Sequence, residues 1–280
     1  MTAPSTGSAA PATAPAMVRR AWRRFGGGAV LVAVSLAAFA AFTWPFLATA
    51  LPADAQRAVP VLAIALAIVL AAGVLVALGD GAQGAMLLAM LGTLTAVGMV
   101  LRFAGTGVGG FETVLVLLIL AGRVFGPRFG FLLGATVMLG SALLWGGVGP
   151  WLPFQVFAAG WIGAGAGLLG SRRGRARVED PTSRSRLELL LLAVYGALAS
   201  YAFGLLMNVW FWPFAVGSDT AISYDGAANA GENLVRFLGY SLVTSTLTWD
   251  TVRAITTVVG IVLIGRPVLA ALRRSPLAKR

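Results

Sequence analysis

The sequence predicts an all-α integral membrane protein with about eight transmembrane helices. Hydrophobic residues make up 58% of the 280 residues and charged residues only 11%, whereas a soluble domain carries roughly 25% charged residues. The mean hydropathy is +0.86. Because a helix needs about 20 apolar residues to cross a bilayer, this length allows roughly six to nine spans and leaves no room for a large soluble domain.

Eight apolar runs justify that number of helices. They cover residues 28–50, 58–79, 85–101, 111–124, 129–145, 151–170, 187–214 and 249–271. The first run follows the basic segment 19–24 and is about twice as long as the apolar core of a signal peptide, so we expect an uncleaved first span. The fourth run is short. It covers about 21 Å of a hydrocarbon core of about 30 Å, which predicts a short or tilted helix, or half of a re-entrant pair with 129–145.

The distribution of charge predicts the orientation of the helices. The connection at 171–186 carries six arginines, and the C-terminal end 273–280 is also basic. The connection at 215–233 holds three acidic residues and no basic one. Basic connections stay on the cytoplasmic side, so we expect a multi-pass protein of the cell membrane with both termini cytoplasmic. Residues 1–27 contain almost no large apolar side chain before Met17 and are expected to form a disordered tail, and 273–280 a basic cytoplasmic tail.

Several kinds of chemistry are excluded by composition. The chain has no cysteine and no histidine, which rules out disulfides, zinc sites of the Cys/His type, histidine-ligated haem and Ser-His or Cys-His nucleophiles. No P-loop motif is present. The net charge of +11 is concentrated beside the apolar runs, which is typical of membrane proteins and not of nucleic-acid binding. We expect no metal and no cofactor.

Polar and aromatic residues gather at the predicted outer ends of the helices. The candidate substrate-binding residues are Arg102, Phe111, Glu112, Trp145, Trp151, Gln155, Asn208, Trp210, Trp212, Trp249, Asp250 and Arg253. An unpaired polar group in hydrocarbon costs several kcal/mol, so such residues face a partner, a cavity or a ligand.

Simpler interpretations account for part of this set. Tryptophan is common at membrane interfaces, and Asp250 and Arg253, three residues apart, would pair on one helix. Gln155 and Asn208 have no partner nearby in the sequence, and we expect them to line a substrate pocket that opens to the outside.

Two stretches of the chain carry a resemblance to a known family: "AGRVFGPRFGFLLGATVMLGSALLWGGVGPWLPFQVFAAGWIGAGAGLLG" and "TWDTVRAITTVVGIVLIGRPVLAALRR". Through them, residues 84–272 resemble the substrate-specific S component of an energy-coupling factor (ECF) vitamin transporter. The resemblance implies a six-helix substrate-binding membrane core that is not itself an enzyme. It also implies a vitamin-like substrate, and assembly with a transmembrane coupling protein and two ATPase subunits.

The resemblance also bears on docking and on substrate. It implies that the coupling protein docks on small residues four apart on the first core helix, and Ala85 and Ala89 fit that spacing. Cobalamin is the leading substrate, with thiamin, riboflavin, biotin and queuosine precursors open. Residues 28–79 lie outside the resemblance and form two additional transmembrane helices that precede the core.

Two other functional classes stay open at this stage. An intramembrane enzyme would need positioned acid and base groups, for which Glu112 and Asp250 are the candidates. A non-transporting membrane scaffold would need no substrate site at all. Binding of a vitamin panel separates transport from scaffolding, and copurification with ATPase subunits separates an ECF transporter from a lone carrier.

Overall fold

The computed structural model describes residues 27–49, 51, 57–79, 84–105, 109, 111–145, 147–169, 181–217 and 220–279, and every regular element within these ranges is helical. The helices are α2 (Gly27–Phe42), α3 (Trp44–Ala48), α5 (Val59–Gly79), α6 (Ala85–Gly105), α7 (Val114–Phe125), α8 (Pro127–Trp145), α9 (Leu152–Leu169), α10 (Pro181–Ala215), α11 (Ala230–Ser241), the π-helical segment η2 (Leu242–Asp250), α12 (Thr251–Arg274) and the 3-10 helix η3 (Pro276–Lys279). The predicted N-terminal tail and most of the arginine-rich connection lie outside the described residues.

The predicted class, an all-α membrane protein, is confirmed. Each of the eight apolar runs coincides with a helix, and in the described part of the chain five helical stretches are long and apolar enough to cross a membrane. One boundary differs from the sequence prediction, because the last helix starts at Ala230 instead of residue 249 and runs without interruption through η2 into α12. Its start is fixed by the Asn229 side chain, which accepts a hydrogen bond from the Glu232 backbone N–H at 2.9 Å, as expected of an N-cap residue.

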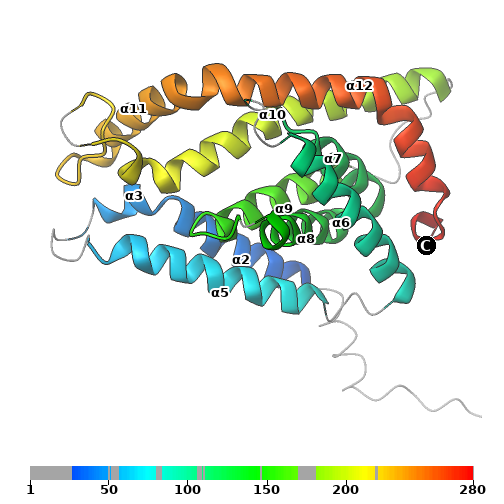
Figure 1. The fold of residues 1–280 in the computed structure, drawn as a ribbon, viewed down its shortest axis with the longest axis horizontal. Coiled ribbons are helices and arrows are strands. Elements are labelled where there is room, and N and C mark those ends of the chain that lie inside the picture. The colour runs from blue at the N-terminus through cyan, green and yellow to red at the C-terminus, as the bar shows by residue number, and fades with distance from the viewer. Residues whose placement is uncertain are drawn as a thin grey trace, which may run out of the picture.

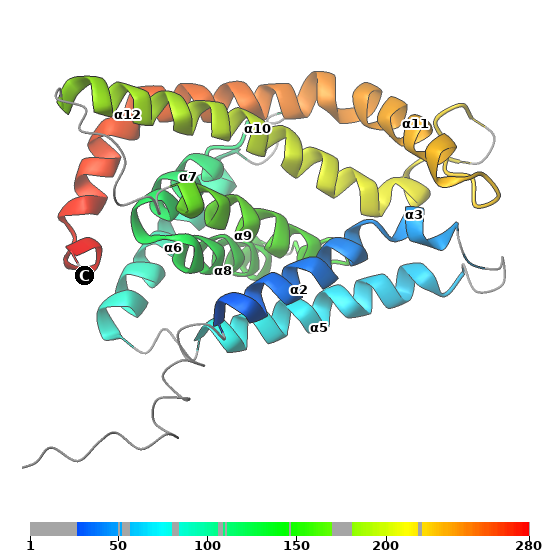
Figure 2. The same ribbon diagram turned by 180° about the vertical axis from the view of Figure 1, so that it is seen from behind.

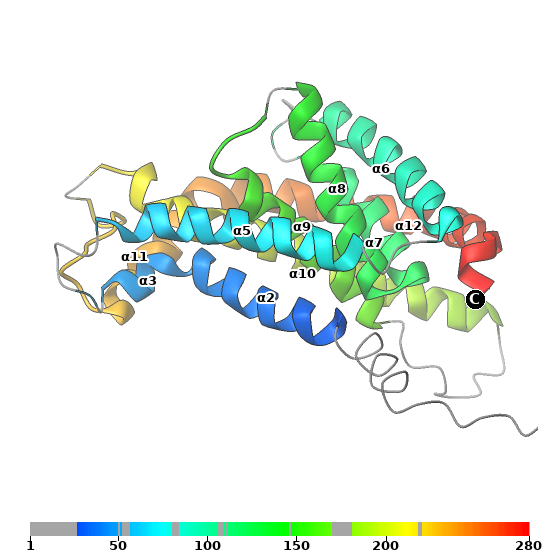
Figure 3. The ribbon, with the colours of Figure 1, turned by 90° about the horizontal axis from the view of Figure 1, so that it is seen from below.

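Two long antiparallel helix pairs enclose the centre of the molecule. Helix α10 runs beside α11, η2 and α12 along one edge, and α2 runs beside α5 along the other (Figure 1). Helices α7 and α9 lie between the two pairs, which the opposite view also shows (Figure 2), whereas α6 and α8 project to one side of them (Figure 3). The short helix α3 lies at the end of the α2–α5 pair, close to the end of α10 and to α11.

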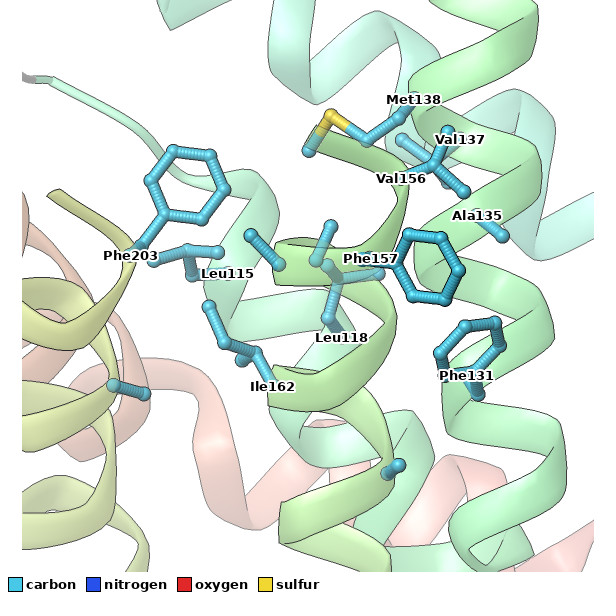
Figure 4. Packing of buried hydrophobic residues seen from close by; sticks show 14 of the residues in the cluster. Leu115, Leu118, Phe131, Ala135, Val137, Met138, Val156, Phe157, Ile162 and Phe203 are labelled. Carbon is cyan, nitrogen blue, oxygen red and sulfur yellow. The ribbon is translucent and has the colours of Figure 1, made fainter. Parts of the chain in front are cut away.

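The short fourth helix, α7, lies inside the bundle. All residues from Val114 to Gly122 are buried. Leu115 and Leu118 of α7 pack with Phe157 and Ile162 of α9 (Figure 4). A helix that is surrounded by protein does not need the length of a lipid-exposed span, because its ends meet protein groups and not hydrocarbon.

Glycines determine how closely α7, α8 and α9 approach. Gly126 joins α7 to α8 with a backbone φ of +92°, a conformation that favours glycine, and Pro127 follows as the first residue of α8. A methyl group on Gly130 would overlap the backbone carbonyl of Gly163 on α9. Gly126, Gly130 and Gly134 recur every four residues, a spacing that lets the backbones of two helices approach closely.

The additional N-terminal helix pair packs directly on the core. Figure 3 shows α2 and α5 alongside α9, and α5 contacts both α8 and α9. The Trp161 indole of α9 donates a hydrogen bond to the Ser35 hydroxyl of α2 at 2.9 Å, and its ring lies 5.3 Å from that of Phe42. These contacts make α2 and α5 part of one bundle with the helices that follow.

Candidate functional site

Arg253, near the start of α12, is the centre of a buried cluster of charges. Its Nε donates to Glu112 Oε2 at 2.7 Å, and its Nη1 donates to Asp250 Oδ1 at 2.5 Å. The guanidinium also lies 5.1 Å from the ring centroid of Phe203 and donates to the Ser200 carbonyl at 3.4 Å. The predicted Asp250–Arg253 pair is therefore confirmed, and Glu112, from a distant part of the chain, completes it.

Asp250 connects this cluster to Asn208. Its side chain is only 1% exposed, and its second oxygen accepts a hydrogen bond from the Ser245 hydroxyl at 2.9 Å. Asn208 Nδ2 donates to that hydroxyl at 2.6 Å and to the Ser241 hydroxyl at 2.8 Å. The carboxylate lies directly against Gly204, where any side chain would overlap it.

The π-helical segment η2 explains why these groups meet. Three polar residues face α10 from this segment: Ser241 directly before it, Ser245 within it and Asp250 at its end. The wider turn of the π-helix directs all three side chains toward α10. π-Helical segments occur frequently at functional sites because they re-aim side chains that an α-helix would spread around its surface. Asn208 therefore has partners after all, but they are 33 and 37 positions away in the sequence.

Arg102, at the end of α6, forms the second half of the polar site. It donates from Nη1 to the Ser141 hydroxyl at 2.5 Å and from Nη2 to Gln155 Oε1 at 2.9 Å. Its positive charge also interacts with the carboxylate of Glu112. The site therefore contains two arginines and two carboxylates, and its charges balance.

Gln155 retains hydrogen-bonding capacity in this arrangement. Its carbonyl oxygen is occupied by Arg102, and within the described part of the chain its amide nitrogen donates no hydrogen bond. An amide nitrogen offers two donors, so Gln155 presents free donor capacity beside a fixed positive charge.

The predicted aromatic residues divide into two groups. Trp145, Trp151, Trp249 and Phe111 are exposed, and Trp145 stacks on Phe103 with ring centroids 4.9 Å apart. Exposed rings of this kind fit an aromatic belt.

Trp210 and Trp212 are buried instead, in a layer of rings contributed by α3, α9, α10 and α11. Trp210 stacks on Phe154 at 4.5 Å with the rings 5° from parallel, and Trp212 packs against Phe46. The Trp44 indole donates to the Trp210 carbonyl at 3.0 Å. The sequence predicts these tryptophans at the outer end of α10, but not the α3 residues that cover them.

The segment 220–229 holds α3 against this aromatic layer. The Tyr224 hydroxyl donates to the Pro45 carbonyl at 3.1 Å, and the Trp212 indole donates to the Ile222 carbonyl at 2.8 Å. Burial, with a contribution from the negative charge of Asp225, raises the pKa of the Tyr224 hydroxyl. That group therefore remains a hydrogen-bond donor at physiological pH.

The comparison with known proteins agrees with this arrangement. The family described as "ECF transporter, substrate-specific component" matches residues 86–268, about two thirds of the chain. The chain belongs to this family. It is therefore a substrate-specific transporter subunit and a multi-pass membrane protein. No curated relative and no solved structure matches the chain.

The family match includes all of the polar site of this S component and none of the N-terminal pair. Helices α6 to α11, and α12 up to residue 268, carry the match, whereas α2, α3 and α5 precede it. Even so, α3 contributes Trp44 and Phe46 to the aromatic layer beside the site. The aromatic layer beside the site is thus built partly from residues that precede the family match.

Sequence reasoning missed three contributors to the site. Ser141 and Ser245 bond Arg102 and Asp250, but single serines in apolar helices give no signal because their hydroxyls usually bond their own helix. Phe154 directly precedes Gln155 in the "GPWLPFQ" turn. Because Gln155 was already a candidate site residue, its neighbour Phe154 could have been included.

Proposed function

We propose that this S component binds a vitamin or related micronutrient on the outer side of the cell membrane, with cobalamin the first candidate. The observation that carries the proposal is the Arg102–Gln155 pair, which presents free amide donors beside a charge-balanced polar network. A corrinoid is a large, largely apolar ring that carries amide side chains. Its carbonyl groups suit the Gln155 donors, and its ring suits the exposed indoles of Trp145 and Trp151.

The proposed roles of the remaining residues follow from their contacts. Arg253 is held by Glu112 and Asp250, so these three residues join the start of α7 to the start of α12, beside Ser200 and Gly204 in the middle of α10. Asn208 sets the position of η2. Arg102 and Gln155 are the residues that meet the substrate. A charge-balanced site of this kind suits a substrate that is neutral where it contacts the protein.

The basic end of the bundle supports a cytoplasmic position for both termini. Arg123 at the end of α7 and Arg273 at the end of α12 both pair with Glu188 near the start of α10, at 2.8 and 2.5 Å. Basic residues are retained on the cytoplasmic side. The polar site lies toward the other ends of α7 and α12, where Glu112 and Arg253 are placed, and that end faces outward in this proposal.

The proposal includes docking of a transmembrane coupling protein on α6, with two ATPase subunits supplying the energy. Ala85 and Ala89 are exposed, and so are Gly92 and Ala96 along the same helix. A methyl group on Gly92 would meet no neighbouring atom. An exposed row of small residues allows the backbone of a partner helix to approach closely.

The binding site is tested with two variants of Gln155. Gln155→Glu keeps an acceptor for Arg102 but removes the amide donors, whereas Gln155→Leu removes both. We expect Gln155→Glu to weaken cyanocobalamin binding to purified protein by about 5- to 150-fold, which corresponds to about 1–3 kcal/mol for a lost hydrogen bond. The melting temperature without ligand should not fall, because the carboxylate still accepts from Arg102. Gln155→Leu should weaken binding similarly and also lower the melting temperature.

Riboflavin, thiamin and biotin are titrated in parallel with cyanocobalamin. If one of them binds in its place, the substrate assignment is wrong and the site assignment stands. If none binds, a non-transporting scaffold becomes the better explanation. Unchanged affinity in Gln155→Glu would remove Gln155 from the site.

The docking surface is tested by replacing Ala85 and Ala89 together with leucine. Vitamin uptake by cells and copurification of the ATPase subunits should be lost, whereas binding to the isolated subunit should persist, because the site lies at the other end of α6. Equal loss of uptake and binding would contradict docking on this face.

A further inference from the structure

One buried polar group in the aromatic layer has no partner. The Trp210 side chain is only 3% exposed, and its Nε1–H makes no hydrogen bond within the part of the chain that the structure describes. Buried donors in folded proteins are nearly always paired, so an unpaired one requires an explanation. No other buried side-chain nitrogen or oxygen in the described residues is left in this state.

The neighbouring tryptophans show that the chain ordinarily supplies such partners. The indoles of Trp44, Trp161 and Trp212 donate to the Trp210 carbonyl, the Ser35 hydroxyl and the Ile222 carbonyl respectively. The Trp210 donor is thus an exception in its own layer.

The Trp210 ring is also held firmly in place. It lies parallel to Phe154 at 4.5 Å, and Phe154 is in turn contacted edge-on by Phe42 at 4.9 Å. The backbone carbonyl of Trp210 is fixed by Trp44. Phe42 ends α2 and Trp44 begins α3, so these N-terminal helices and the core together set the direction of the free N–H.

We propose that Trp210 Nε1 donates a hydrogen bond to a neutral acceptor on the transported substrate, a carbonyl oxygen or a ring nitrogen on a conjugated, otherwise apolar part of the molecule. The rings around Trp210 carry no charge, which excludes an ionised group at this position. This inference rests on the proposed function and extends it, because it assigns α2 and α3 a part in substrate binding.

The position of Gln155 supports a two-point mode of recognition. Gln155 follows Phe154 directly in α9, so the amide donors lie one residue from the ring on which Trp210 of α10 stacks. Neighbouring side chains point in different directions around a helix, so the two donors would approach a substrate from different sides. A substrate that reaches both must carry hydrogen-bond acceptors at two places around a planar body. The class is therefore a neutral conjugated heterocycle with amide or carbonyl substituents.

The test uses full-length protein in dodecyl maltoside, with its tryptophans labelled by indole nitrogen-15. The Trp210 Nε1–H resonance is assigned by its loss in Trp210→Phe, and that of Trp161 by its loss in Trp161→Phe. Cyanocobalamin is titrated first, and then riboflavin, thiamin and biotin. We expect the Trp210 resonance to move downfield when one of them binds, and the Trp161 resonance to stay in place because its donor is already paired with the Ser35 hydroxyl.

Affinities and melting temperatures provide the matched comparison. Trp210→Phe keeps a ring stacked on Phe154 but has no donor, and it should weaken binding of that compound about 5- to 30-fold. Trp161→Phe removes a satisfied hydrogen bond to Ser35, so it should lower the melting temperature more than Trp210→Phe and leave the affinity nearly unchanged.

The outcomes separate this inference from the proposed function. If a compound binds and the Trp210 resonance does not move, the inference is overturned and the proposed function stands. If no compound binds, both fail. A downfield shift on transfer to dioleoylphosphatidylcholine nanodiscs, with no compound added, would assign the acceptor to a lipid ester carbonyl and would also overturn the inference.

Discussion

Replacing Asp250 with asparagine should destabilise the bundle measurably. The wild-type carboxylate accepts hydrogen bonds from Arg253 and from Ser245 while it is almost completely buried. Asparagine has nearly the same shape, so packing against Gly204 is preserved. The substitution therefore isolates the negative charge, and with it the ionic hydrogen bond to Arg253.

The expected loss of stability depends on which ion-pair partner Arg253 keeps when Asp250 is replaced. Removing one partner from a buried ion pair costs about 3–5 kcal/mol when the other charge is left alone. Arg253 keeps Glu112 at 2.7 Å, so the loss should approach that of one charge-assisted hydrogen bond, about 2–3 kcal/mol. At about 2–4 °C per kcal/mol for a protein of this size, the melting temperature should fall by roughly 5–10 °C.

The assay is thermal unfolding in detergent, followed by tryptophan fluorescence. Glu112→Gln should have a smaller effect, because that carboxylate is 20% exposed and partly solvated. Asp225→Asn is the matched control: its pair with Arg236 is 3.7 Å long and exposed, and such pairs contribute about 0–1 kcal/mol. If Asp250→Asn lowered the melting temperature no more than Asp225→Asn, the buried charge of Asp250 would not hold the helices together.

Three other substitutions test packing, orientation and the α3 contact. Gly130→Ala should destabilise the protein by about 1–3 kcal/mol through overlap with α9, whereas Gly92→Ala, on an open face of α6, should be neutral or slightly stabilising in thermal unfolding. In intact cells, a membrane-impermeant maleimide should label Ala227→Cys and spare Arg274→Cys until the cells are lysed, and the reverse would show that the bundle is inverted. Tyr224→Phe should cost about 0.5–1.5 kcal/mol and speed hydrogen exchange in α3, and unchanged exchange would show that this hydroxyl does not hold α3.

Composition and apolar runs were sufficient to predict the helices. A run such as 85–101 has few alternatives in a bilayer, because an unpaired backbone polar group in hydrocarbon is costly and a helix satisfies all of them internally. The prediction that the last helix begins at residue 249 was wrong, because that helix begins at Ala230. The polar residues between Ser241 and Thr251 are typical of a connection, but in the structure they bond α10 and their own helix and so continue the helix.

The types of site residue could be predicted from the sequence, but their pairings could not. Arg102 bonds Gln155 across 53 positions, and Arg253 bonds Glu112 across 141. Nothing local to these residues identifies the partner, because the contact depends on how the helices pack. The Asp250–Arg253 pair was predictable since both residues lie on one helix and three positions apart.

The enclosure of α7 has a consequence for how the protein responds to its lipids. A thicker or thinner bilayer acts on helices that touch acyl chains and changes their tilt, which here means chiefly α6, α10 and α12. Helix α7 is in contact with protein along its length, so acyl-chain length exerts no direct force on it. Glu112, next to one end of α7, and Arg123, in its last turn, are each held by an ion pair to a neighbouring helix. The distance between the Glu112–Arg253 ion pair and the Glu188 ion pairs is therefore a property of the protein itself, and it should be the same in membranes of different thickness.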